Sequence, residues 1–176
     1  MIADSVRLAL PAEASEIAAI QRRAWAQQLP ADVAWSVLRG IDADSMATSW
    51  HAAIVRPPLA TLRVLVAIGG ARVAGFAAVG PSTDPDAESS DGLIAEFVID
   101  PAAQRRGHGS RLLNACIDTM RADGFSRATW WVRSVDDIVR VFATGAGWAA
   151  DGSHSEVGSE DDRTRLKLVR LHTSIG

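Results

Sequence analysis

The segment from Leu93 to Leu113 constrains this chain more than any other, because it joins an apolar strand to a basic, glycine-containing turn that opens a helix. The strand carries a single acid, Glu96, and the turn contains Gly107 and Gly109. The first N–H groups of a helix have no partner inside it, and the peptide dipoles place partial positive charge there. A phosphate binds well at such an end, and glycines let the backbone approach it. The segment therefore predicts a diphosphate site beside a strand with a candidate base.

Two other phosphate-binding motifs fit this segment poorly. A dinucleotide-binding fingerprint needs a third glycine, and Leu112 stands at that position. A P-loop needs Gly-Lys followed by Ser or Thr, and the only lysine of the chain is Lys167. Arg105 and Arg106 instead supply two cations whose planar donors match phosphate oxygens. A nucleotide-binding protein that holds a different diphosphate at the same helix end is an alternative.

Length and composition predict one soluble domain. A chain of 176 residues, 48% of them hydrophobic, can bury about 70% of its unfolded surface. Its single cysteine, Cys116, excludes an internal disulfide, and it lies in an apolar helical stripe where it is expected to pack as a small hydrophobe. The N-terminus does not read as a signal peptide, and no apolar run approaches the roughly 20 residues that cross a bilayer. We expect a cytoplasmic protein without a membrane partner.

The charges are unevenly distributed along the chain. The net charge of −3 argues against a nucleic-acid partner held by counterion release. Residues 81–100 contain six acids and residues 151–162 contain five, with no basic residue in either segment, whereas residues 104–111 contain three arginines. A positive pocket for an anionic cofactor and acidic loops for a cationic acceptor would produce this arrangement. Solvated loops that happen to be acidic explain it equally well.

Hydrophobic periodicity and turn residues predict an alternating order of strands and helices. Strands are predicted at residues 5–10, 61–68, 72–79, 93–99, 127–133 and about 163–171, with Gly69-Gly70 closing a hairpin. Helices are predicted from Pro11 to Pro30, from Asp32 with a break at Gly40 and a restart at Asp44, from Gly107 to Asp123, and from Asp136 to Ala146. The acidic segments 81–92 and 151–162 are predicted to be loops.

The pattern Gln104-x-x-Gly107-x-Gly109, preceded by a strand that ends in Val98-Ile-Asp-Pro101, resembles the acetyl-CoA signature of the GNAT N-acetyltransferases. The resemblance extends over about residues 4–171 and implies one domain, 1–176. It implies the GNAT fold, an α/β (α+β) architecture with a mixed, mostly antiparallel sheet of about seven strands and helices on both faces. It also implies acetyl-CoA as co-substrate and direct transfer of an acetyl group to a primary amine, on a small molecule or a protein.

A base is useful for this reaction, and Glu96 is the candidate. Deprotonating a lysine-like amine at pH 7 costs roughly 4–5 kcal/mol. Glu96 is the only charged residue between Leu93 and Ile99, and strand alternation would place Ile94, Glu96 and Val98 on one face. The resemblance implies that Glu96 acts as base, often through water. The alternative is a carboxylate paired with an arginine at the sheet edge.

The resemblance also assigns residues to the cofactor and the acceptor. It implies that the pantetheine arm binds backbone groups of Phe97, Val98 and Ile99. The pyrophosphate would bind at the turn formed by Gln104, Arg105, Arg106, Gly107, His108, Gly109 and Ser110. The acceptor would lie between the first two helices and the last hairpin, lined by Trp25, Trp35 and Trp148, although a tryptophan at any one of these positions is more often a core residue.

The chain departs from the family at two positions. Ala143 stands where many members have a tyrosine that protonates the leaving thiolate, and the chain contains no tyrosine. Asp136 replaces a frequent asparagine that donates to the cofactor arm. A non-catalytic acyl-CoA-binding module is therefore the alternative function. The histidines and the cysteine lack the spacing of metal ligands, so no metal is expected, and the family implies a monomer or a homodimer.

Overall fold

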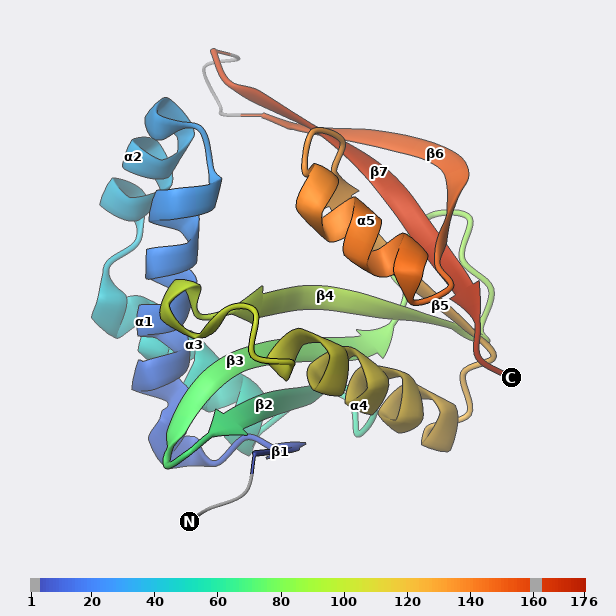
Figure 1. Cartoon of the computed structure of the whole chain (residues 1–176), viewed down its shortest axis with the longest axis horizontal. Helices are drawn as coiled ribbons and strands as arrows, with labels where there is room; N and C mark the ends of the chain where they lie inside the picture. The colour runs from blue at the N-terminus through green and yellow to red at the C-terminus, as the bar shows by residue number, and fades with distance from the viewer. Residues whose placement is uncertain (1–3, 159–162) are drawn as a thin grey trace.

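The computed structural model describes residues 4–158 and 163–176 and contains a seven-stranded mixed sheet (Figure 1). The strand order is β1-β2-β3-β4-β5-β7-β6; β4 and β5 run parallel, and all other neighbours are antiparallel. The predicted fold class is thereby confirmed. The elements are β1 (Ser5–Leu8), α1 (Ala14–Gln28), α2 (Ala31–Gly40), α3 (Ala43–Val55), β2 (Arg63–Gly69), β3 (Arg72–Pro81), β4 (Asp91–Ile99), α4 (His108–Ala122), β5 (Arg127–Arg133), α5 (Asp137–Gly145), β6 (Ala149–Gly158) and β7 (Arg165–Ser174), with 3-10 turns at Pro11–Glu13 and Pro101–Ala103.

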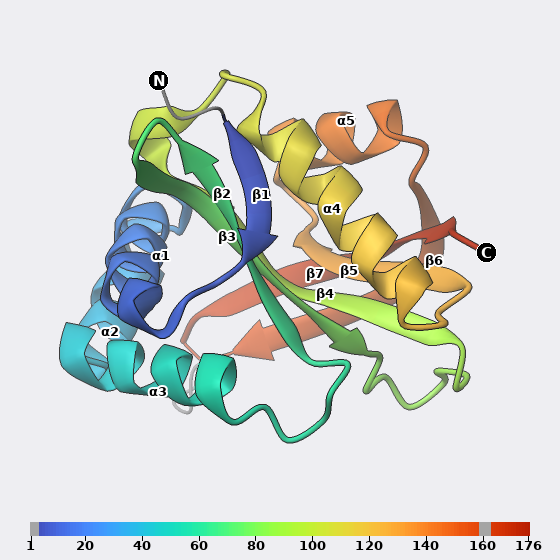
Figure 2. The same ribbon diagram turned by 90° about the horizontal axis from the view of Figure 1, so that it is seen from below.

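Helices cover both faces of the sheet (Figure 2), and each face has its own hydrophobic core beneath the helices. On one face α1 places Ile17 and Ile20 against Val66 and Phe76, and α3 adds Trp50 at the edge. On the other face α4 and α5 pack on β2 to β5 and β7, with the predicted apolar stripe of α4 buried or partly buried. On the first face the core beneath the helices extends over β2 to β4, and no described residue of β5, β6 or β7 belongs to it.

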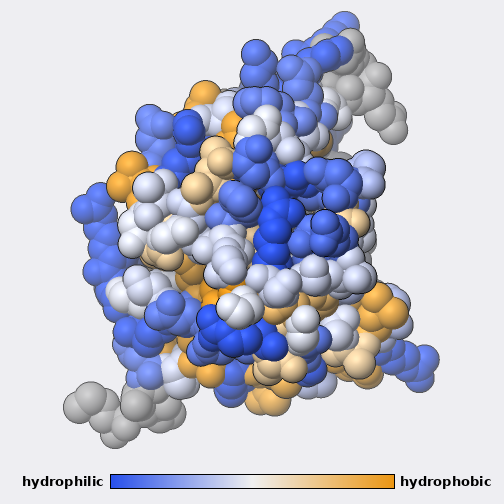
Figure 3. Space-filling model, turned by 90° about the vertical axis from the view of Figure 1, so that its right-hand side faces the viewer, coloured by the Kyte–Doolittle hydropathy of each residue, from blue (hydrophilic) through white to orange (hydrophobic). Residues whose placement is uncertain are grey.

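The structure differs from the predicted elements in two places. The third helix is capped by Asp42 rather than Asp44: the Asp42 carboxylate accepts from the backbone N–H of Ser45 at 2.7 Å, which gives the helix an earlier start. Residues 149–158, most of them assigned to an acidic loop, form β6 instead. Its backbone pairs with β7 while most of its side chains are exposed, so the segment carries no alternating hydrophobicity. The surface around the β6–β7 hairpin, in the upper part of Figure 3, is mostly hydrophilic.

The register of β4 contains an irregularity that controls the direction of its side chains. Ala78 of β3 pairs with Glu96, but the next residue, Val79, pairs with Ile94, so Ala95 is an extra residue on β4. This is the geometry of a β-bulge. Ile94 therefore packs on the face of α4 and α5, whereas Val98 packs on the face of α1. The prediction that Ile94, Glu96 and Val98 share one face is wrong for Ile94, because alternation restarts after the bulge.

Candidate active site

The two central parallel strands pair only over their first halves. The register of β4 with β5 runs from Asp91↔Arg127 to Ile94↔Trp130 and stops there. Beyond this point Phe97 and Ile99 remain paired with β3 on one side. Their backbone groups on the side of β5 have no strand partner, so an extended chain that carries amides can add to the sheet at this position.

Glu96 lies at the start of this separation, on the face of α1. It pairs in register with Ala78 and follows the bulged Ala95. The Glu96 side chain makes no hydrogen bond or ion pair with any residue that the structure describes, so the alternative of an arginine-paired carboxylate is not what the structure contains. Burial among apolar neighbours raises the pKa of the Glu96 carboxyl to about 7. A carboxyl with this pKa can accept a proton at neutral pH.

The turn before α4 directs unpaired backbone N–H groups outward. Gly107 precedes α4 with φ 80°, and Arg105 has φ 61°, a left-handed conformation that is unfavourable for a residue with a side chain. No acceptor within the described chain binds the backbone N–H of His108, Gly109 or Ser110. This combination of helix start and αL residues is typical of backbone turns that bind anions.

The charged side chains of the same turn are available to a ligand. Arg105 and Arg106 are exposed and form no ion pair with residues 4–158 or 163–176. Gln104 and Ser110 are also exposed. The predicted pyrophosphate residues therefore lie together on one accessible turn, with the exception of one side chain.

That exception is His108, whose backbone lies in the turn but whose side chain is buried beneath it. The ring stands against Gly69 at the end of β2, where an added Cβ would come within 2.8 Å of the His108 Cε1. Its Nδ1 lies 2.9 Å from a guanidinium nitrogen of Arg111, which also contacts Asp4 and the carbonyl of Arg106. The His108 side chain thus holds the turn onto the β2–β3 hairpin.

Aromatic side chains form the wall of the separation on the side of α4 and α5. Phe97 packs against Trp130, with ring centroids 4.9 Å apart, and against Phe142 of α5 at 6.2 Å. Phe142 also approaches the start of α4, where its Cζ would lie 3.6 Å from a Cβ on Gly109. The side chain of Val98 points the other way, into the core beneath α1. Phe97 and Ile99 are therefore the two predicted arm residues whose side chains face this wall.

The structure does not bring the three predicted acceptor tryptophans together. Trp25 is half-buried on the last part of α1. Trp35 is 62% exposed on α2, with the guanidinium of Arg39 4.8 Å above its ring. Trp148 is 3% exposed and packs edge-on against Trp130 in the core beneath α4 and α5. Trp148 therefore lies on the face opposite to Glu96, where an acceptor bound beside Glu96 does not reach it.

The residues at the two positions that depart from the family pattern, Ala143 and Asp136, both have structural roles. Ala143 is fully buried in the core beside α4. The carboxylate of Asp136 caps α5 by accepting from the N–H of Val139 at 3.1 Å, and it also pairs with Arg133. Neither side chain is free to donate a proton or an amide hydrogen to a ligand.

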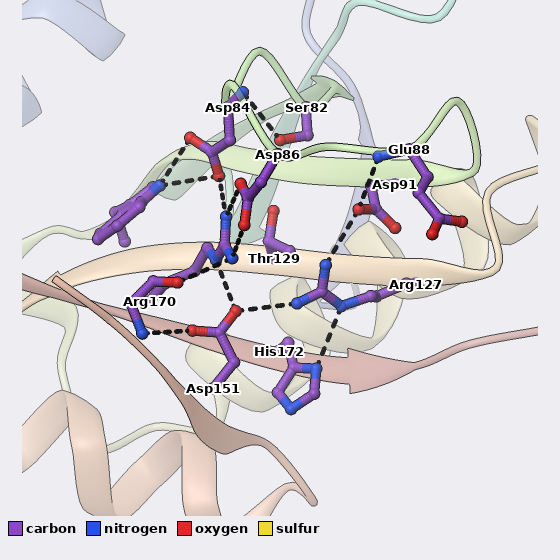
Figure 4. A network of polar contacts seen from close by, with 12 residues as sticks. Ser82, Asp84, Asp86, Glu88, Asp91, Arg127, Thr129, Asp151, Arg170 and His172 are labelled. Carbon is purple, nitrogen blue, oxygen red and sulfur yellow. Dashed lines mark hydrogen bonds and ion pairs between the residues drawn. The ribbon is translucent and has the colours of Figure 1, made fainter. Parts of the chain in front are cut away.

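A polar network lies on the uncovered half of the face that carries Glu96 (Figure 4). Two arginines, Arg127 of β5 and Arg170 of β7, share the carboxylate of Asp151. Arg127 also pairs with Asp91 and donates to His172, and Arg170 binds the β3–β4 loop. The acids of this network are therefore paired rather than simply solvated. Three acids of the segment 151–162, Glu160, Asp161 and Asp162, lie outside the described residues.

Comparison with known proteins places this geometry in a family. The chain matches the acetyltransferase (GNAT) family over residues 24–146 and belongs to it. No curated protein shows significant sequence similarity to it. In the part of the chain that the structure describes, no group of His, Cys, Asp or Glu side chains is arranged to hold a metal ion, and no helix is long and apolar enough to cross a membrane.

Several solved structures share the fold at low sequence identity. yncA from Salmonella typhimurium, solved with its cofactor acetyl-CoA, has a TM-score of 0.76 and 21% identity, covering 99% of this chain and 95% of the other. An N-acetyltransferase from Staphylococcus aureus Mu50 has a TM-score of 0.78 and 17% identity, covering 99% and 100%. The PaiA N-acetyltransferase of Thermoplasma acidophilum, in complex with coenzyme A, has a TM-score of 0.71 and 11% identity, covering 98% and 99%.

Proposed function

We propose that this protein is an acetyl-CoA-dependent N-acetyltransferase that acetylates a primary amine on a cationic acceptor. The observation that carries the proposal is Glu96, a partly buried carboxyl with no described partner and a pKa raised to about 7, at the point where β4 and β5 separate. A structural carboxylate would be paired, whereas a base must be free to take a proton.

The residues around the separation fit acetyl-CoA. The unpaired backbone edge of Phe97 and Ile99 suits the amides of the pantetheine arm, and Phe142 bounds the arm from α5. The N–H groups at the start of α4, with Arg105 and Arg106, suit the pyrophosphate. When bound, acetyl-CoA supplies an acetyl group activated as a thioester. Cofactor-bound relatives with the same fold support this assignment.

Glu96 acts on the acceptor. The acceptor arrives as an ammonium, and the Glu96 carboxylate takes one of its protons, directly or through water. The neutral amine forms a bond to the acetyl carbon and the carbon–sulfur bond breaks. The nitrogen gives its surplus proton to water, and the thiolate takes a proton from water, so the protons balance. Solvent suffices for this last step because an ordinary thiol has a pKa near 8.5, so the loss of the family tyrosine at Ala143 slows the reaction without preventing it.

A cationic acceptor is supported by the charges beside Glu96. The network on this face contains the carboxylates of Asp84, Asp86, Asp91 and Asp151 and two arginines. Its formal charge is therefore −2. The Arg170 guanidinium lowers the pKa of Asp86 to about 2, so this carboxylate stays ionised at neutral pH.

Thiol release on addition of amines tests the proposal. The protein is mixed with acetyl-CoA and each member of an amine panel, and free CoA is measured with a thiol reagent. Cys116 gives no background, because it is fully buried and burial raises the pKa of its thiol to about 12. We expect CoA release that depends on both amine and protein. Thermal stabilisation by acetyl-CoA without CoA release from any amine would instead establish the non-catalytic acyl-CoA-binding module.

A further inference from the structure

Arg170 is a buried arginine that binds two separate segments of the chain. It is 5% exposed, and its guanidinium donates to Asp84, Asp86, Asp151 and Ser153 at 2.6–3.0 Å. The first two acceptors belong to the β3–β4 loop and the other two to β6 (Figure 4). Breaking such a set leaves buried charges unpaired, so the arrangement is rigid.

This network fixes the side chain of Trp131. The indole N–H donates to both carboxylate oxygens of Asp84, at 3.0 and 3.1 Å. Arg170 pairs with Trp131 across β5 and β7, and its Cζ lies 5.6 Å from the ring centroid. Asp84 in turn binds Arg170 at 3.0 Å. The edge and one face of the indole are therefore both held.

Trp131 lies on the same face of the sheet as Glu96. Trp131 is the first residue of β5 beyond the last β4 pair, Ile94↔Trp130, so it stands where the strands separate. Trp130 packs in the core of α4 and α5, which places Trp131 on the opposite face, the face of Glu96. Arg170 of β7 lies over one side of the ring, and among the described residues no other cation or aromatic ring is stacked on it.

The charge of Arg170 does not prevent a second cation from approaching the ring. Three carboxylates contact this one guanidinium, so the net charge around it is negative. An indole face is the strongest aromatic site for a cation. An ammonium arriving at Glu96 would therefore meet an aromatic surface with negative charge at its edge.

We propose that Trp131 is an acceptor-binding residue, whose free face takes the cationic group of the amine in a cation–π contact, and that Asp84 and Arg170 are positioning residues that hold the ring. This inference rests on the proposed function and names the substrate class of that site, an amine with a second positive charge. Neither the acidic segments nor the family resemblance singles out Trp131.

The test compares three amines of similar length in wild-type protein and in variants. 1,5-Diaminopentane carries a second cation, pentylamine a neutral chain and 6-aminohexanoate an anion. We expect kcat/KM to fall in that order for wild type. Trp131→Ala should raise the KM for 1,5-diaminopentane by about 3- to 30-fold and remove its advantage over pentylamine. The KM for acetyl-CoA should not change. Trp131→Phe should be intermediate, because a phenyl ring is retained without its N–H anchor.

The positioning roles of Asp84 and Arg170 are tested with conservative substitutions. Asp84→Asn and Arg170→Lys should raise the KM for 1,5-diaminopentane and leave the KM for acetyl-CoA unchanged. Asp118→Asn removes an aspartate from an exposed arginine pair on α4 and is the control, with no expected effect. A loss of melting temperature alone, without a change in the order of the three amines, would show that the network is only structural and would overturn the positioning roles.

Binding is measured separately from turnover. In protein saturated with CoA, the indole ¹⁵N–H resonance of Trp131, assigned with Trp131→Phe, should shift on addition of 1,5-diaminopentane and less with 6-aminohexanoate. No shift at millimolar amine, or an unchanged acceptor KM in Trp131→Ala, overturns the inference. Failure of every amine to release CoA would contradict the proposed function instead, and the resonance shift would still decide the role of Trp131.

Discussion

Glu96 and Ile94 are separated by a single residue of β4, yet their side chains lie on opposite faces of the sheet. The extra residue between them, Ala95, turns the carboxyl away from α4 and α5 and toward the opposite face, the face of α1. In the proposed function, the acceptor therefore binds on the face of Glu96, opposite to the face that α4 and α5 cover.

Replacing Glu96 by glutamine should change how the rate depends on pH. In wild type, kcat/KM should rise with pH through an apparent pKa near 7 as the carboxyl loses its proton. Glu96→Gln should lower the rate at pH 7 by about 10²- to 10⁴-fold. The rate should recover partly at high pH, where the free amine becomes abundant. Thiol release measured from pH 6 to 10 checks this.

Glu156→Gln serves as the control for that measurement, because Glu156 is an exposed carboxylate of β6 paired with Arg165. It should leave the profile of wild type unchanged. A Glu96→Gln profile with the same shape as wild type would exclude Glu96 as the base.

The same substitution should stabilise the fold at alkaline pH. The pKa of Glu96 is about 7 in the folded protein and near 4.5 when unfolded, so between these values the folded state binds more protons. The free energy of unfolding therefore falls as pH rises from about 4.5 to 7, by up to about 3 kcal/mol. Glu96→Gln should melt at a higher temperature than wild type at pH 8, with most of this gain absent at pH 5. An equal effect at both pH values would contradict burial of the charge.

Gly69→Ala, a substitution on β2, should disturb the turn before α4. The new Cβ would come within 2.8 Å of the His108 ring, which must move and take the start of α4 with it. We expect a loss of about 1–3 kcal/mol in unfolding free energy and weaker acetyl-CoA binding. Adding His108→Ala should relieve the clash, so the two substitutions should be non-additive in denaturant unfolding. Gly145→Ala, where a Cβ meets nothing within 4 Å, is the control.

Arg106→Gln should weaken cofactor binding without affecting the acceptor. Arg106 is exposed and unpaired among the described residues, so its loss removes an attraction to phosphate that solvent partly screens. We expect the Kd for CoA to rise about 5-fold at low salt and less at high salt. Arg56→Gln removes an exposed arginine at the end of α3 and should have no effect. Equal losses in both variants would show a non-specific charge effect.

The sequence predicts the backbone of the turn before α4 and the position of β5 closely, because both depend on local signals. Gly107 ends the turn with positive φ at the position expected for the start of a helix, and β5 spans the predicted residues 127–133. The bulge at Ala95 left no such signal, since alanine fits a regular strand as well as a bulged one. The direction of Glu96 relative to Ile94 was therefore predicted wrongly.

The polar network shows a second limit of prediction from the sequence. The sequence shows the acidic residues of the β3–β4 loop as a cluster. It does not show that Asp86 pairs with Arg170, which lies 84 positions later in the chain. Such a pair depends on the order of strands in the sheet, with β7 between β5 and β6, which the charge pattern does not contain. Trp131 contacts the same network, and its proposed role in acceptor binding follows only from the residues that contact its ring.

Calorimetric titration of the pure protein with acetyl-CoA tests the central claim, that the start of α4 and the open edge of β4 hold this cofactor. We predict saturable heat with one site per chain and a weaker response for Arg106→Gln. The absence of any heat at millimolar acetyl-CoA would contradict the claim and remove the basis for the proposed activity.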